Sequence, residues 1–313
     1  MIKFVKKILL FGLIFSCIII GLLYYFYRIG GNDLPAPAFS NSISFNEKID
    51  FIRGKDLSKI EHIVLGSSMS LNNIDSETIV KYLGENYFNL GSWGFKISDS
   101  ENYLRNMIHL FPNLKTVIIS TTFVDFSSSV RNIVVDYDLV RNSILYDIGN
   151  WVYLFSLDIR YLKNNSETNK LKMRSSGSYD ILSFDKYGGV ILKLDKDQIN
   201  QERWNNDILD FDVSESELKS LSGIINLLHK RNVKTVIAIP PQREGLMNEE
   251  KRIRLGKEID RIRSAVHDQN GFFVNSFERG SWNDSLFVDY CHLNKAGAVI
   301  YTDYILSSIA FQP

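Results

Sequence analysis

The sequence predicts an α/β fold: a three-layer α/β/α sandwich with a central parallel sheet of about five strands, preceded by one N-terminal transmembrane helix. Three observations support this prediction. Short β-type runs alternate with longer amphipathic stretches, as strands and helices alternate in α/β domains. The run at 116–120 is apolar nearly throughout, which is typical of a parallel strand buried on both faces. The chain also opens with a long apolar segment that contains no charge after Lys7.

The N-terminal segment predicts a membrane anchor at residues 1–28. Three lysines within the first seven residues precede an apolar run from about residue 8 to 27. Roughly 20 helical residues cross a bilayer core of about 30 Å. Lysines before the run favour a cytoplasmic N-terminus, so we expect a single-pass protein of the cell membrane whose main domain is extracytoplasmic.

A cleaved signal peptide is the alternative for this segment. Ala36-Pro37-Ala38 has the small residues of a cleavage site, but it lies well beyond the apolar run. A lipoprotein signal at Cys17 does not fit, because apolar residues continue on both sides of it. The anchor and the signal peptide both place the rest of the chain outside the cytoplasm.

The remaining chain predicts a linker at 29–55 and one α/β domain at 56–313. The linker is rich in Gly, Pro, Ser and Asn up to about residue 46. Strands are expected at 62–65, 86–90, 116–120, 235–239 and 272–275. Helices are expected from about residue 75 or 76, and at 98–110, 214–230, 248–267 and 295–310.

The stretch at about 125–213 interrupts this alternation and predicts an insertion. It is rich in Tyr, Trp, Asn and Ser, with short helical stretches such as 143–157. We expect it near the ends of the central strands. A role in binding and a loosely packed cap without such a role both remain open.

Composition argues against several functional classes. Lys and Arg together number 36, as do Asp and Glu, so there is no basic excess of the kind that marks nucleic-acid-binding proteins. The sequence contains no phosphate-binding G-x-x-x-x-G-K-[ST], no dinucleotide-binding G-x-G-x-x-G, no C-x-x-C and no H-E-x-x-H. We therefore expect no cofactor, no metal and no nucleic-acid partner.

Three loops carry chemistry, and two of them follow strands at the edge of the sheet where active sites form. Gly66-Ser67-Ser68 follows the first strand, and the spacing of Ser70 excludes the G-x-S-x-G turn of α/β-hydrolases. The loop at 89–94 contains two glycines, Gly91 and Gly94, after the second strand. Asp289 and His292 stand three residues apart before the last helix, so that one segment supplies a base and the carboxylate that orients it.

These three blocks together resemble the SGNH (GDSL-like) hydrolase family over residues 61–308, with the insertion unmatched. The resemblance implies a catalytic triad of Ser68, Asp289 and His292. It also implies an oxyanion hole from the backbone N–H groups of Ser68 and Gly94. The family's first block reads G-D-S, and Ser67 stands here in place of its Asp. That change resembles the membrane-anchored branch with DltD-like proteins of teichoic acid D-alanylation and alginate-acetylation proteins.

One family block departs from the pattern. The third block, G-x-N-D, supplies an Asn side chain to the oxyanion hole, and residues 120–125 contain no Asn. Phe123 occupies the expected position, with Thr121 and Thr122 as possible replacement donors. Loss of one oxyanion donor costs on the order of 10²–10³ in rate. The departure leaves open a slow enzyme, an enzyme with another donor, and an inactive one.

The resemblance implies a serine-dependent acyl ester hydrolase or O-acyltransferase that acts on cell-surface polysaccharide or a teichoic-acid-like substrate. A multi-spanning membrane acyltransferase is the partner expected for a transferase. The alternative is a catalytically degenerate SGNH domain that binds glycan or acts as a scaffold in a membrane complex. A lipase ranks lower, because the insertion is mixed in composition rather than strongly apolar.

Overall fold

The computed structural model describes residues 2–29, 39–128, 132–146, 179, 182–194, 198–206, 212–267, 269, 271–280 and 282–310. Within them, a five-stranded parallel sheet has the order β2-β1-β3-β4-β5. Its strands are β1 (His62–Leu65), β2 (Tyr87–Asn89), β3 (Thr116–Ser120), β4 (Lys234–Ile239) and β5 (Phe272–Asn275). The register pairs Val64 with Asn89 on one side of β1 and with Ile118 on the other. The predicted fold class is confirmed.

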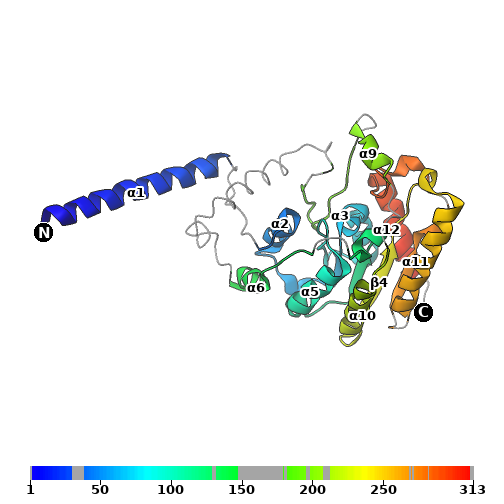
Figure 1. Cartoon of the computed structure of the whole chain (residues 1–313). Coiled ribbons are helices and arrows are strands. Elements are labelled where there is room, and N and C mark those ends of the chain that lie inside the picture. Colours follow the sequence, from blue (N-terminus) through cyan, green and yellow to red (C-terminus); the bar gives the residue numbers. More distant parts are fainter. Residues whose placement is uncertain are drawn as a thin grey trace.

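Helices cover both faces of this sheet. Their bounds are α2 (Ile43–Ile52), α3 (Ser68–Asn73), α4 (Ser76–Leu83), α5 (Ile97–Met107), α6 (Tyr137–Tyr146), α9 (Gln201–Trp204), α10 (Glu215–His229), α11 (Glu249–His267) and α12 (Lys295–Ala310). Short 3-10 helices lie at Leu57–Lys59, Ile108–Leu110, Phe123–Phe126, Glu244–Leu246, Ser276–Arg279 and Asp284–Leu286. Figure 1 shows α10 and α11 beside β4.

Alternate residues of each strand divide the core into two layers, because successive side chains of a strand point to opposite faces. On one face Ile63, Val117 and Ile237 pack with residues of α2, α5, α10 and α11. On the other face Val64 and Ile118 pack with residues of α4 and α12. The sheet is therefore buried on both faces, as the apolar strands predict.

The order of strands positions the candidate site. The chain runs from β1 outward to β2, then returns to β3 on the other side of β1 and continues to β4 and β5. Such a reversal leaves a crevice at the carboxyl ends of the two central strands. The loops after β1 and β3, which begin at Gly66 and Thr121, meet at this crevice.

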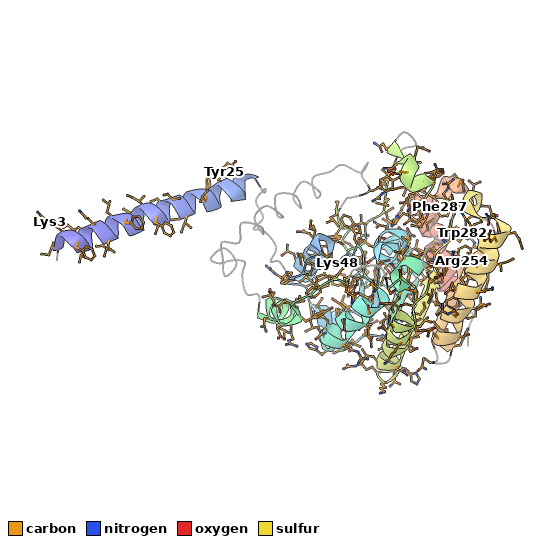
Figure 2. The ribbon with its side chains drawn as sticks, in the orientation of Figure 1. Lys3, Tyr25, Lys48, Arg254, Trp282 and Phe287 are labelled. Atoms are coloured by element: carbon orange, nitrogen blue, oxygen red, sulfur yellow. The ribbon has the colours of Figure 1, made fainter. Side chains whose placement is uncertain are left out.

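The N-terminal helix α1 (Ile2–Ile29) stands clear of the sheet domain in Figure 1. Its Ile2–Leu22 segment is long and apolar enough to cross a membrane, and none of that segment is buried against the protein. Lys3 and Tyr25 lie toward opposite ends of the helix (Figure 2).

The structure differs from the sequence-based expectation in three elements. Residues 43–52, within the predicted linker, form α2 instead, because Phe45, Ile49 and Ile52 lie on one helical face and are buried in the core. The short helix α3 begins at Ser68 and was not predicted. The helix expected at 143–157 begins earlier, as α6, and residues 147–157 lie outside the described part of the chain.

Candidate active site

Ser68 is the first residue of α3, directly after the turn that follows β1. This turn requires glycine at position 66, where φ is +133° and a Cβ atom would lie 2.8 Å from Ser70 Oγ. Ser67 caps the helix by accepting a 3.2 Å hydrogen bond from the Met69 backbone N–H. The N–H of Ser68 stands in the first turn, where helical N–H groups have no acceptor within the helix.

The structure brings Ser68, His292 and Asp289 together in one hydrogen-bonded chain. His292 Nε2 lies 2.9 Å from Ser68 Oγ, and His292 Nδ1 lies 2.8 Å from Asp289 Oδ2. Ser68 and His292 are 224 residues apart in the sequence, so the contact depends on the fold. A hydroxyl, an imidazole and a carboxylate in this order form the arrangement that activates a serine as a nucleophile.

Asp289 is almost completely buried and is held by its own loop. Its Oδ1 atom accepts hydrogen bonds from the backbone N–H groups of Cys291, at 2.9 Å, and His292, at 2.6 Å. Burial by itself raises the pKa of the Asp289 carboxyl, but the charge and hydrogen bonds of His292 and the bond from Cys291 outweigh it. The pKa of Asp289 therefore lies below its usual value, and the carboxylate remains ionised to orient His292.

The loop after β3 contains a second buried carboxylate, Asp125. Its Oδ2 atom accepts hydrogen bonds from Ser67 Oγ at 2.7 Å, Thr121 Oγ1 at 3.0 Å and the Thr122 backbone N–H at 3.0 Å. Burial raises the pKa of Asp125 to about 6, against the opposing effect of these bonds. Phe123, at the position of the missing Asn, is buried in the core. The Thr121 hydroxyl is directed to Asp125, so its proton is committed there.

The glycine-containing loop after β2 lies against the serine loop. The Ser92 backbone N–H donates a 2.9 Å hydrogen bond to the Gly66 carbonyl, and the Trp93 N–H donates a 3.0 Å bond to Ser44 Oγ. Gly94 follows with φ +72°. The side chain that this loop contributes to the cavity at Ser68 is Trp93, so the oxyanion role of Gly94 stays a prediction.

A cavity of about 270 Å³ opens at Ser68 and His292. Its other lining residues were not singled out from the sequence: Asn72, Trp93, Tyr179, Leu192 and Arg203. Asn72 lies four residues after Ser68 in α3, and this helical spacing could have identified it. The last three belong to the predicted insertion, so part of the insertion forms the wall of the site.

A larger hollow of about 810 Å³ lies between α4 and residues 183–193. Lys295 lines it and pairs there with Asp75 and, at 3.1 Å, with Glu77. The residues that line this hollow include neither Ser68 nor His292. The smaller cavity is therefore the one with a nucleophile and a base.

Asp289, Cys291 and His292 also place three potential metal-ligand atoms within 4.8 Å of one another. A thiol binds a metal as the thiolate, but burial raises the pKa of Cys291 well above its usual value. Asp289 and His292 are bound to each other and to backbone groups. These donors fit a proton-transfer chain better than a metal site.

Comparisons with known proteins find solved structures that are similar to this one at low sequence identity. No family model matches the chain, and no curated protein matches it in sequence. The structure is similar to an acetyl xylan esterase, AlAXEase, with a TM-score of 0.42 and 13% identity over 80% of this chain and 100% of that one. An acetylxylan esterase from Geobacillus stearothermophilus has a TM-score of 0.42 and 11% identity, covering 82% and 96% of the two chains.

A GDSL-like lipase from Bacteroides thetaiotaomicron has a TM-score of 0.40 and 10% identity, covering 85% of this chain and 93% of that one. All of these TM-scores and identities are low. Function is therefore inferred from the geometry of Ser68, His292 and Asp289.

Proposed function

We propose that this chain is a serine-dependent acyl ester hydrolase or O-acyltransferase that acts on cell-surface polysaccharide outside the cytoplasmic membrane. The observation that carries the proposal is the continuous chain from Ser68 Oγ through His292 to Asp289, with distances of 2.9 and 2.8 Å. It lies on a cavity that can admit a small ester.

In the proposed reaction, His292 Nε2 accepts the hydroxyl proton of Ser68 as Oγ attacks the ester carbonyl. Asp289 holds His292 in the tautomer that leaves Nε2 free and stabilises the imidazolium that forms. The backbone N–H groups of Ser68 and Gly94 stabilise the oxyanion. Collapse expels the alcohol, which takes the proton from His292, and leaves an acyl-serine.

The second half of the reaction decides between hydrolase and transferase. His292 removes a proton from either water or a sugar hydroxyl, whose oxygen attacks the acyl-serine. The bond from the acyl carbon to Ser68 Oγ then breaks, and Ser68 Oγ takes the proton back from His292. The same residues serve both outcomes. A transferase requires an acyl donor outside the membrane, which a multi-spanning membrane acyltransferase supplies in this proposal.

The proposed location follows from α1. Its apolar segment is of membrane-spanning length, and the lysines at its start favour a cytoplasmic N-terminus. The sheet domain then lies outside, where teichoic-acid-like polymers and other surface glycans are the available substrates. A DltD-like or alginate-acetylation role is part of this proposal.

A first experiment uses the full chain in detergent micelles and follows p-nitrophenyl acetate hydrolysis and fluorophosphonate labelling. We expect both in the wild type and neither in Ser68→Ala or His292→Ala. Matched controls are Ser183→Ala and His267→Ala, which alter exposed residues outside the cavity. Activity that survives Ser68→Ala would overturn the proposal.

A second candidate function is a degenerate SGNH domain that binds glycan or acts as a scaffold. The committed Thr121 hydroxyl and the buried Phe123 favour it, because neither replaces the missing Asn of the third block. A folded wild type that reacts with neither probe, even with the membrane acyltransferase and its acyl donor present, would support this function over the first.

A further inference from the structure

Arg203 places a positive charge in the wall of the cavity that contains Ser68 and His292. It belongs to α9, which lies in the insertion. The insertion is also the part of the chain that has no counterpart in the family resemblance. A residue here can determine which ester is accepted without taking part in the proton transfers.

Arg203 is attached directly to the loop that contains Asp289 and His292. Its carbonyl accepts a 3.2 Å hydrogen bond from the Tyr290 backbone N–H. Its own N–H donates to Asn200 Oδ1 at 3.1 Å, which caps α9. These bonds hold the backbone of Arg203 in a set position relative to His292.

The guanidinium of Arg203 lies over the ring of Tyr179, 4.6 Å from the ring centroid. The Tyr179 hydroxyl in turn donates to the carbonyl of Val288, next to Asp289. The next residue, Trp204, is also held in place, with the Arg243 guanidinium 3.4 Å from its ring centroid and paired to Asp284 at 2.7 Å. The ring that the Arg203 guanidinium contacts and the residue that follows Arg203 are therefore both anchored, which limits the entropy lost when Arg203 binds a ligand.

No carboxylate among the described residues forms an ion pair with Arg203. Arg243, by contrast, is paired with Asp284. Asp289, which is bound to His292, also accepts hydrogen bonds from two backbone N–H groups. The planar guanidinium presents several N–H donors in a fork that matches the oxygens of a carboxylate or phosphate. Within the described part of the chain, the charge of Arg203 is therefore not neutralised by a carboxylate and can pair with a ligand.

We infer that Arg203 recognises an anionic group, a carboxylate or a phosphate, on the substrate close to the reacting ester. The preferred substrate is then an acylated acidic glycan rather than a neutral one. This inference rests on the proposed function for its reaction, but anion recognition is a binding property that can be measured without turnover.

The kinetic test uses the full chain in detergent and three acetylated sugars: a methyl glucoside, the corresponding methyl glucuronide and the methyl glucoside 6-phosphate. We expect the wild type to favour at least one anionic ester over the neutral ester by about tenfold or more in kcat/KM. The two anionic esters show whether a carboxylate or a phosphate is preferred. Added salt lowers the preference, because it screens an exposed charge.

In Arg203→Gln we expect kcat/KM to be equal for anionic and neutral esters. Arg203→Lys keeps the positive charge but lacks the planar guanidinium, so it should retain part of the preference for the anionic ester. Arg231→Gln is the matched control, because Arg231 is exposed and precedes β4, at the opposite end of the strand from the site. Equal kcat/KM for all three esters in the wild type would overturn the inference. So would an equal loss on neutral and anionic esters in Arg203→Gln, which would indicate a role with the oxyanion instead.

A binding measurement separates this inference from the proposed function. In Ser68→Ala, calorimetry with the non-acetylated methyl glucuronide, glucoside 6-phosphate and glucoside requires no reaction. We expect tighter binding of an anionic sugar, by about tenfold, and its loss on adding Arg203→Gln. If anionic sugars bind in this way but the wild type proves inactive, the proposed function is rejected and the inference about Arg203 stands. Equal binding of charged and neutral sugars, or no binding of either anionic sugar, overturns the inference even if the esterase is active.

Discussion

Ser67 donates a 2.7 Å hydrogen bond to the buried carboxylate of Asp125, which lies 58 residues later in the chain. The two residues come from the loops after β1 and β3, which are neighbours in the sheet. Ser67 also caps α3, whose first residue is Ser68. The Ser67–Asp125 bond therefore ties the position of the proposed nucleophile to the adjacent strand.

Replacing Asp125 tests how much its hydrogen bonds contribute to the stability of the fold. Asp125→Ala leaves the buried donors of Ser67, Thr121 and Thr122 without their acceptor, so we expect the free energy of unfolding to fall by about 2–4 kcal/mol. Asp125→Asn is the matched variant. Since all three bonds reach Oδ2, an amide oxygen in that place retains them, and the loss should be less than half as large. Urea unfolding of both variants at pH 7 measures the difference, and equal losses would contradict the argument.

Asp289→Asn is expected to reduce kcat by about 10³–10⁴ while the fold is retained. The amide oxygen can still accept the N–H groups of Cys291 and His292, as Oδ1 does now. The amide nitrogen then faces His292 Nδ1 and donates to it, which places the imidazole proton on Nε2. That tautomer cannot accept the proton of Ser68.

Ester hydrolysis and thermal unfolding of Asp289→Asn, measured side by side, check this expectation. An unchanged melting temperature with lost activity would support the tautomer argument. A kcat within tenfold of the wild type would show that Asp289 does not orient His292 in the reaction.

Lys48 of α2 is completely buried and predicts a dependence of stability on pH. Its ammonium group donates to the carbonyl oxygens of Asn89, at 2.9 Å, and Gly188. Burial lowers the pKa of Lys48 from 10.5 to about 7, although the charge of Asp185 opposes the shift. Between about pH 7 and 10 the unfolded chain therefore binds more protons at this residue than the folded one, and Lys48 makes stability rise with pH.

Lys48→Met removes that contribution. The free energy of unfolding of the wild type, minus that of the variant, should increase from pH 7 to 10 by at most about 1.4 kcal/mol per pH unit. Urea unfolding at several pH values measures the slope. A difference independent of pH would mean that Lys48 has an ordinary pKa in the folded protein.

The strands could be predicted from the sequence because each is a short apolar run bounded by turn residues. Those at His62–Leu65, Thr116–Ser120 and Phe272–Asn275 have the expected bounds. The strand expected at 86–90 is one residue shorter at each end, and the strand expected at 235–239 begins one residue earlier. The spacing of Asp289 and His292 likewise placed the base and its carboxylate on one loop. Local pattern was sufficient in these cases.

Contacts between distant segments could not be predicted in this way. The bond between Ser67 and Asp125 exists because β1 and β3 are adjacent, and the sequence does not show that order. Tyr179 and Arg203 reach the cavity from a stretch without helical or strand periodicity, where pattern carries little information. The Gly-, Pro- and Ser-rich residues before α2 favour a linker, and for this reason the helix was not predicted, although the spacing of Phe45, Ile49 and Ile52 is helical.

The packing of α2 makes residues 43–52 part of the domain rather than a flexible tether, and Ile49→Ala tests this. Ile49 is 0% exposed and lies in the core beneath the sheet face that α5 and α10 also cover, so its truncation should lower the free energy of unfolding by about 2–5 kcal/mol. Ile253→Ala is the matched control, since Ile253 is 56% exposed on α11 and its truncation should change the value by less than about 0.5 kcal/mol. Urea unfolding of the two variants decides the matter: equal small effects would mean that α2 detaches without cost and that the linker extends to residue 55.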